Sequence, residues 1–83
     1  MNATEAFDKV VAIIGPFAKN ADALKAANRD TKILTDLGVN SARLVDIILA
    51  FEDEFNIAID DDTADKIRTL RDAVDQIVAL TSK

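Results

Sequence analysis

Three stretches of the chain place apolar residues three and four positions apart, and this spacing constrains the fold more than any other feature. The first stretch lies within residues 7–14, the second within 44–55 and the third within 70–80. A side chain returns to the same face of an α-helix at this interval, so each stretch predicts a helix with one buried face. We expect an all-α domain in which three amphipathic helices share one core.

Capping signals predict where two of these helices begin. In a capping box, a small polar residue and an acidic residue three positions later each accept a hydrogen bond from the other's backbone amide. Two pairs have this character and would start the first and last helices: Asn2 with Glu5, and Thr69 with Asp72. Proline disfavours helical geometry in the residue before it, so the Gly15-Pro16 pair should end or kink the first helix near Ile14.

The second helix is expected from Ser41 to Phe55, with Asn40 or Ser41 as its N-cap. Before it, residues 17–36 form a long connection with a helical turn at 21–27. After it, we expect a loop and then a short helix over 61–67, whose first residues are acidic and suit the positive end of its dipole.

A long loop in a small domain needs an anchor, and the connection before the second helix has few apolar residues to supply one. Ile33 and Leu34 are adjacent apolar residues near its end. We expect both to be buried.

The acidic residues are concentrated in one segment. Residues 36–65 contain nine acids and one base, Arg43, and so carry −8; the rest of the chain has six acids and nine bases, or +3, which together give the net charge of −5. Val45 and Leu49 lie beside these acids, displaced from the core stripe. They either widen that stripe or belong to a mixed apolar and acidic face, which would attract basic protein surfaces and repel nucleic acid.

Missing residue types exclude most enzymatic chemistry. The 83 residues include no cysteine and no histidine, so neither a zinc site of the usual ligands nor a histidine-activated serine is possible. The acidic run 60–65 lacks the glycine and glutamate that a calcium loop needs at its sixth and twelfth positions, where Asp65 and Arg71 stand. We expect no catalytic residue and no metal site.

Other properties of the chain predict its setting. No apolar run approaches the length of a membrane span, and the first residues lack the basic and apolar regions of a signal peptide. The length fits a single domain over residues 1–83. We expect a cytoplasmic monomer that binds other proteins.

Four segments follow one another in an ordered succession: 36–41 (DLGVNS), 52–57 (EDEFNI), 59–61 (IDD) and 66–74 (KIRTLRDAV). This succession resembles the acyl carrier protein family over roughly residues 33–80. In that family an Asp-Leu-Gly-x-Asp-Ser-Leu motif opens the second helix and a Glu-Glu-Glu-Phe-like run closes it. An Ile-x-Ile-Pro-like loop and a Lys-Ile-x-Thr-x-x-Asp-Ala segment follow.

The resemblance implies a fold, a cofactor and partners. The family folds as a four-helix bundle with a long first loop and a short third helix. Its modified serine aligns with Ser41, which a phosphopantetheinyl transferase would load with 4′-phosphopantetheine from coenzyme A. The arm would carry acyl groups as thioesters between enzymes of fatty-acid, lipid or polyketide synthesis. Partners of the family contact the second helix through basic docking surfaces. Five positions of this chain match that helix surface: Val45, Asp46, Leu49, Glu52 and Asp53.

Three residues around the serine depart from the family pattern. Asn40 replaces an aspartate, Ala42 replaces a large apolar residue, and Arg43 adds a positive charge. Asn40 could still cap the helix but would bind a cation less well, whereas Arg43 could pair with the phosphate of the arm. The Asn-Ser-Ala sequence indicates a specialised carrier.

Two alternatives stay open. A carrier-like protein that is never modified would act only by docking through its acidic face, and Asn40 and Ala42 favour it. A peptidyl or aryl carrier of nonribosomal synthesis is the other, although such carriers usually have Gly-Gly-x-Ser where this chain has Gly38-Val39-Asn40-Ser41.

Overall fold

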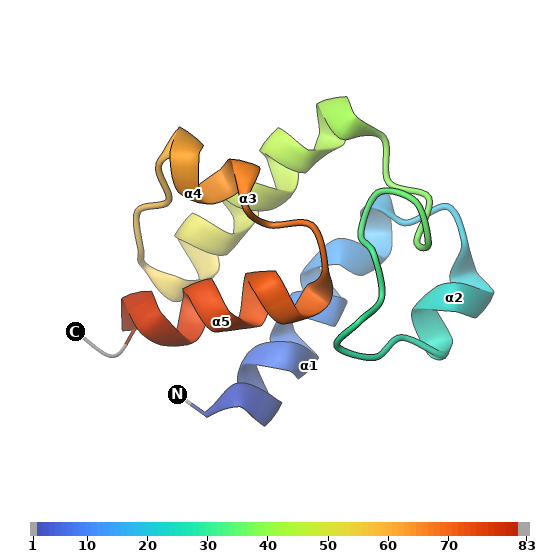
Figure 1. Ribbon diagram of the computed structural model, residues 1–83, viewed down its shortest axis with the longest axis horizontal. Helices are drawn as coiled ribbons and strands as arrows, with labels where there is room; N and C mark the ends of the chain where they lie inside the picture. The colour runs from blue at the N-terminus through green and yellow to red at the C-terminus, as the bar shows by residue number, and fades with distance from the viewer. Residues whose placement is uncertain (1, 82–83) are drawn as a thin grey trace.

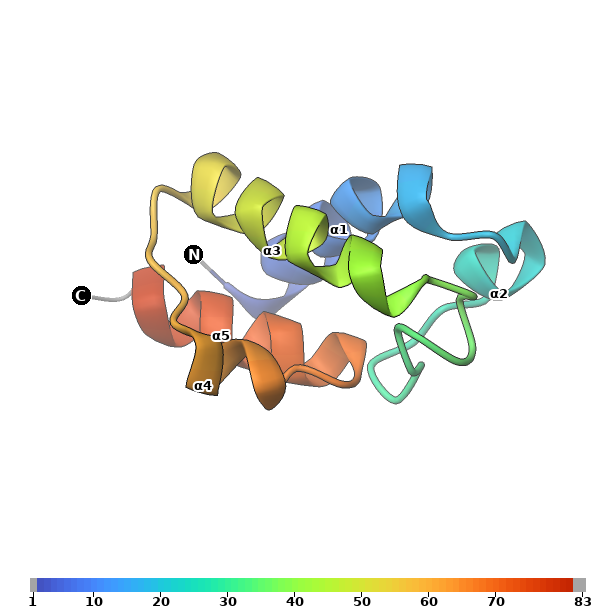
Figure 2. The same ribbon diagram turned by 90° about the horizontal axis from the view of Figure 1, so that it is seen from above.

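Helices account for most of residues 2–81, which are the residues that the computed structural model describes. The elements in chain order are α1 (Ala3–Ile14), the 3-10 turn η1 (Gly15–Phe17), α2 (Ala21–Lys25), α3 (Ser41–Phe55), α4 (Asp61–Asp65) and α5 (Leu70–Thr81). The three long helices pack on one another, with α1 contacting both α3 and α5 (Figures 1 and 2). The all-α bundle with a long first connection and a short helix after α3 is confirmed.

Both predicted capping pairs begin a helix: Asn2 caps α1, and Thr69 with Asp72 forms the full capping box of α5. The Asn2 side-chain oxygen accepts a hydrogen bond from the Glu5 amide at 2.8 Å. At the start of α5, the amide of Asp72 donates to the Thr69 hydroxyl at 3.2 Å, and the Thr69 amide donates to the Asp72 carboxylate at 3.1 Å. Burial opposes the charge on Asp72, but hydrogen bonds from the amides of Arg68 and Thr69 outweigh it and hold the pKa of this carboxyl below its ordinary value.

The end of α1 also follows the prediction. The helix ends at Ile14, and the chain tightens into η1, in which Pro16 takes an early position. Proline is tolerated there because its fixed φ suits the first turn and its missing N–H would have no helical partner. The Ala18 amide closes the turn by donating to the carbonyls of Ile14 at 3.1 Å and Gly15 at 3.2 Å.

The three long helices and the long connection enclose one core. Phe51 of α3 is completely buried, and its ring lies 6.4 Å from that of Phe55. The ammonium group of Lys9 on α1 lies 5.9 Å above the Phe55 ring, which adds a favourable cation–π contact between the two helices. The other large side chains that are fully buried are Val10, Ile14, Ile33, Leu37, Ile47, Leu70, Val74 and Ile77.

Some residues of the predicted apolar stripes lie at the edge of this core. Leu44 of α3 and Val78 and Leu80 of α5 are only partly buried, although they pack against buried neighbours. Leu44 lies beside the exposed start of α3, and the other two lie in the last turns of α5.

The long connection is anchored differently from the prediction. Ile33 is completely buried, as expected, but Leu34 is 38% exposed, so its predicted burial is wrong. Leu37 is completely buried instead. Residues 33–36 form a turn, which the amides of Asp36 and Leu37 close by donating to the Lys32 carbonyl at 3.0 and 3.2 Å. The chain therefore bends back after Ile33, and Leu37 is buried while Leu34 stays at the surface.

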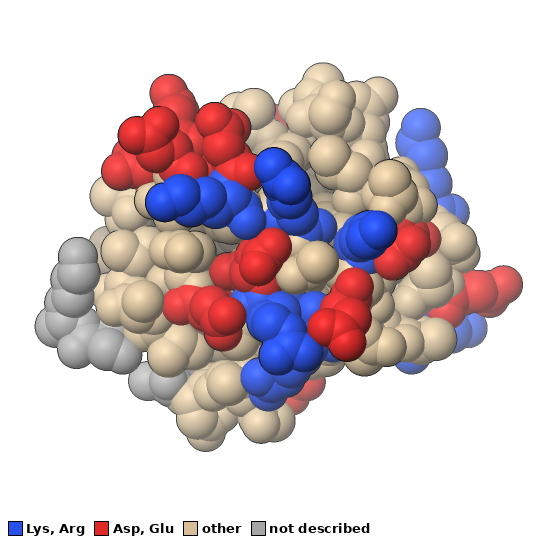
Figure 3. Space-filling view, in the orientation of Figure 1, with Lys and Arg blue, Asp and Glu red and all other residues tan. Residues whose placement is uncertain are grey.

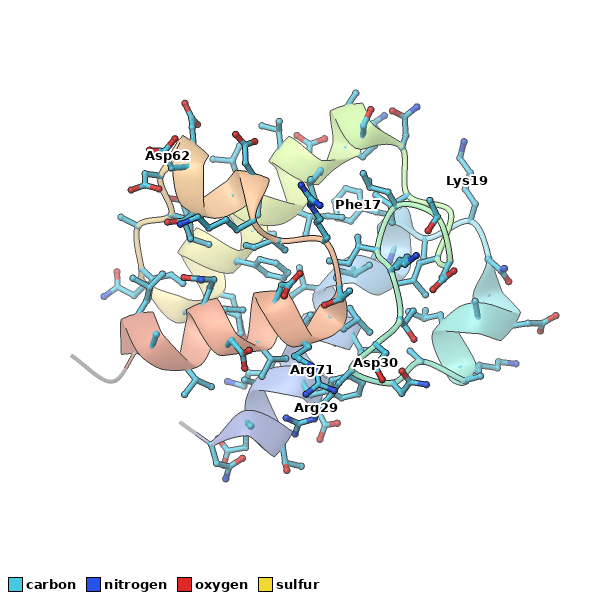
Figure 4. All side chains as sticks on the ribbon, in the orientation of Figure 1. Phe17, Lys19, Arg29, Asp30, Asp62 and Arg71 are labelled. Carbon is cyan, nitrogen blue, oxygen red and sulfur yellow. The ribbon has the colours of Figure 1, made fainter. Side chains whose placement is uncertain are left out.

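Backbone hydrogen bonds fasten the connection to the start of α5. Three of them link the two segments: Ile33 N–H to the Arg68 carbonyl at 3.0 Å, Leu70 N–H to Thr31 at 3.0 Å, and Arg71 N–H to Arg29 at 2.8 Å. The side chains of Arg71 and Asp30 also meet here, at 3.0 Å (Figure 4). Because both of these side chains are largely exposed, the ion pair adds little, and the backbone bonds set the path of the connection.

We predict that Leu37→Ala and Leu34→Ala differ strongly in their effect on stability. Removing the Leu37 side chain leaves a cavity in the core and should lower the free energy of unfolding by about 2–5 kcal/mol. The matched change at the exposed Leu34 should lower it by less than about 1 kcal/mol. Urea unfolding followed by circular dichroism measures both, and equal losses would contradict this assignment of the anchor.

Candidate functional site

The turn that leads into α3 is fixed against the segment after η1. The amides of Lys19 and Asn20 both donate to the carbonyl oxygen of Leu37, at 3.0 and 3.1 Å. Gly38 has a φ of +69°, which favours glycine, and a side chain at this position would meet the Lys19 Cβ at 3.3 Å. The chain therefore enters α3 at Ser41 from a fixed position.

Asn40, and not Ser41, caps α3. Its side-chain oxygen accepts a hydrogen bond from the Ala42 amide at 2.9 Å, and its carbonyl oxygen accepts one from the Arg43 amide at 2.8 Å. Ser41 is the first residue of the helix and is exposed. Because Asn40 supplies the cap, the Ser41 hydroxyl is available for covalent attachment.

The surroundings of Ser41 fit a phosphate group. The N-terminus of the 15-residue helix α3 is a favourable place for an anion. Lys19 and Arg43 line a hollow of about 510 Å³ beside Asn40 (Lys19 is labelled in Figure 4). Arg43 also contacts the Asp46 carboxylate at 3.1 Å, but both side chains are about half exposed or more, so this pair is weak and Arg43 can turn toward a stronger anion.

A groove between α3 and α4 begins at Ser41. It has a volume of about 360 Å³, and most of its α3 side is apolar, whereas two carboxylates of α4 stand at its rim. Its lining residues are Ser41, Leu44, Val45, Ile48, Leu49, Glu52, Ile59, Asp61, Ala64 and Asp65. An apolar group held near Ser41 thus has an apolar surface within reach.

The five residues expected to contact partners all lie on α3. Val45 is 62% exposed and Leu49 is 57% exposed, so they do not widen the buried stripe but stand on the surface. Asp53 is exposed, while Asp46 and Glu52 are half-buried. The face therefore combines apolar and acidic side chains, as the second reading of the sequence predicted, and its contact with partners stays a prediction.

Glu52 has a second role that sequence reasoning missed. Its carboxylate accepts a hydrogen bond from the Ile59 amide at 3.0 Å, in a partly buried position. The two residues are seven positions apart and are brought together by the loop after α3. No short-range pattern in the sequence indicates this contact, because it forms only when the chain reverses direction after α3.

The acids of residues 60–65 gather over α4, where Figure 3 shows them at the upper left. Asp60 caps this helix by accepting from the Thr63 amide at 2.7 Å. Hydrogen bonds from Thr63 hold the pKa of Asp60 below its ordinary value. Asp62 points away from the bundle (Figure 4). Within residues 2–81, no group of three carboxylates is placed to hold a metal ion.

Lys19 is the other site residue that the sequence did not reveal. It lies more than twenty positions before Ser41 and reaches the start of α3 only because its amide bonds to Leu37. Among residues 2–81, no helix is both long enough and apolar enough to cross a membrane.

An exposed serine that opens the long helix α3, beside a surface of acidic and apolar side chains, is an arrangement suited to a small protein that carries a covalently attached arm. Residues 9–77, which include Ser41, match the family model of the phosphopantetheine attachment site. The chain therefore belongs to this family, whose members are carriers rather than enzymes and whose cofactor is phosphopantetheine.

A curated relative supports the same family. The chain is 37% identical over 73 residues to the mitochondrial acyl carrier protein of Saccharomyces cerevisiae. The alignment covers 86% of this chain and 58% of that protein. The chain thus spans less than two thirds of the length of this relative.

We predict that Asn40→Ala destabilises the fold and that Ser41→Ala does not. Loss of the Asn40 cap should lower the free energy of unfolding by about 1 kcal/mol. Loss of the Ser41 hydroxyl should change it by less than about 0.5 kcal/mol, because that hydroxyl is exposed and does not cap the helix. Urea unfolding of the two variants tests the assignment, which fails if Ser41→Ala is the more damaging change.

Proposed function

We propose that this chain is an acyl carrier that holds 4′-phosphopantetheine on Ser41 and presents acyl groups to enzymes of fatty-acid, lipid or polyketide synthesis. The observation that supports it most directly is the exposed Ser41 hydroxyl at the start of α3, left free by the Asn40 cap. When bound, the arm supplies a thiol that carries the acyl group as a thioester. The apolar groove that begins at Ser41 suits an alkyl chain.

Residues around Ser41 would act by position and charge. Arg43 and Lys19 would stabilise the phosphate, and the dipole of α3 would favour the same negative charge. Asn40 would keep the start of the helix rigid, so that the arm leaves from a fixed point. Asn40 and Arg43 depart from the family pattern, and we propose that they select a dedicated set of partners.

Membership of the family implies contact with a phosphopantetheinyl transferase and with enzymes that handle acyl groups. We further propose that these partners contact the α3 face through basic surfaces. The excess of acids over residues 36–65 and the exposed Val45 and Leu49 support this choice. We also propose that the chain is a cytoplasmic monomer with one domain over residues 1–83. The word mitochondrial is part of the name of the yeast relative and is said of that protein alone.

A second candidate is a carrier-like protein that is never modified and acts only by docking. Asn40 and Ala42 favour it, because the family pattern has an aspartate and a large apolar residue at these positions. A peptidyl or aryl carrier of nonribosomal synthesis would use Ser41 in the same way with a different cargo.

Modification of Ser41 is tested by intact mass. After incubation with coenzyme A, magnesium and a broad-specificity phosphopantetheinyl transferase, the wild-type chain should gain the mass of one phosphopantetheine. Ser41→Ala should gain nothing while keeping its helical circular dichroism. A gain in Ser41→Ala would place the attachment site on another residue.

Absence of any gain in the wild-type chain needs one further comparison. The family pattern is restored locally by Asn40→Asp with Ala42→Leu. If this variant is modified and the wild type is not, the two residues block a generic transferase. If neither is modified by that enzyme or by a transferase of the same organism, the docking-only candidate is favoured.

Docking through α3 is tested by charge reversal. Asp46→Lys with Asp53→Lys should slow association with the transferase by roughly tenfold at low salt, because electrostatic attraction steers the encounter. The dependence of the association rate on salt should also become weaker. Asp75→Lys, on the exposed side of α5, is the control that changes charge elsewhere. An unchanged association rate in the double variant would remove the acidic face from the proposal.

A further inference from the structure

One residue holds the loop that returns from α3 to α4. The backbone carbonyl of Glu52 accepts hydrogen bonds from the amides of Asn56 and Ile57, the latter at 3.1 Å. The side chain of Glu52 accepts a third, from the Ile59 amide at 3.0 Å. Asn56 has a positive φ of 53°, so the chain reverses sharply at this point and folds back over Glu52.

The short helix α4 depends on this loop for its position. None of the residues of α4 is buried. Within α4 only the partly buried Ala64 packs against the core, and the larger contacts come from Ile59 before it and Ile67 after it, which are 8% and 3% exposed. A segment that buries little apolar surface opens at a low free-energy cost, so the hydrogen bond to Ile59 has a large share in keeping α4 against α3.

The same carboxylate borders two surfaces. Glu52 and Ile59 both line the groove that begins at Ser41. Glu52 also stands on α3 beside the exposed Leu49 and Asp53, within the face that partners are proposed to contact. A group that binds Glu52 from outside therefore acts directly on the loop that closes the groove.

We propose that the Glu52 carboxylate is the tie that holds α4 against α3, and that a basic side chain of a docking partner opens the groove by drawing this carboxylate away from the Ile59 amide. The second half of the proposal rests on the docking face of the proposed function, whereas the first half concerns the unmodified chain alone. Glu52 is a positioning residue, because it acts through the loop and α4.

Competition between the two donors has a simple physical basis. The Ile59 amide is neutral, whereas an ammonium or guanidinium group carries a full charge and forms the stronger hydrogen bond to a carboxylate. The bond to Ile59 is partly buried and so is not already replaced by water. A cation that the acidic surroundings attract therefore binds the Glu52 carboxylate and displaces the Ile59 amide from it.

Hydrogen exchange of the unmodified protein, measured residue by residue by NMR, tests the tie. In Glu52→Ala the Ile59 amide should exchange roughly tenfold faster than in the wild type, since its acceptor is gone. Glu52→Gln keeps an acceptor oxygen and should restore part of the protection. The amides of Val10 and Ile77, which lie in the core, should keep their protection and so exclude global unfolding.

The matched control is Glu54→Ala, which removes an exposed acid from the same helix. It should leave the exchange of Ile59 unchanged. If Glu52→Ala also leaves it unchanged, the carboxylate is not the tie and the proposal is overturned.

The effect of a basic partner is tested with a short oligolysine peptide at low salt. It should shift the resonances of Asp46 and Asp53 and speed the exchange of the Ile59 amide in the wild type. In Glu52→Ala it should cause no further acceleration. Binding without acceleration, or no binding at low salt, overturns the opening step. Neither readout involves Ser41, so failure of the proposed modification would leave both results intact.

Discussion

Backbone hydrogen bonds that fasten the long first connection are the constraint on which the rest of the structure depends. The connection contains little regular structure, so its buried N–H and C=O groups must find partners other than those of a helix or sheet. Some bond within turns of the connection, and others bond to the start of α5. In addition, the Leu37 carbonyl accepts the amides of Lys19 and Asn20 in the segment after η1. Ser41 follows Leu37 by four residues, so its position is set by parts of the chain that are distant in sequence.

The elements that local rules govern could be predicted from the sequence. The capping pairs at Asn2 and Thr69 marked the beginnings of α1 and α5, and α3 has the predicted bounds. These features depend on spacing within one turn of helix. The anchor of the connection could not be predicted in this way. Leu34 and Leu37 are equally apolar, and which of them is buried depends on the turn over residues 33–36 and on the bond of Ile33 to Arg68, which joins distant segments.

For the candidate site, too, the sequence predicted the local features but not the contacts between distant segments. The motif located Ser41 at the start of a helix, and the structure shows its exposure and the cap that Asn40 supplies. The sequence left two readings for Val45 and Leu49, because helical spacing does not show where the neighbouring helices lie. The position of Lys19 near Asn40 and the bond between Glu52 and Ile59 depend on chain reversals, which no periodic pattern records.

Because α4 buries little apolar surface, its sequence can change in evolution more readily than that of the long helices. Folding constrains a residue mainly through what it buries, and α4 buries none of its residues. Its position depends on Ala64, on the apolar residues on either side, on the cap at Asp60 and on the hydrogen bond from Ile59 to Glu52. The exposed residues Asp61, Asp62 and Asp65 can therefore change at little cost in stability. Substitutions in α4 can therefore adapt one side of the groove beside Ser41 to a new cargo or a new enzyme while the helical bundle stays the same.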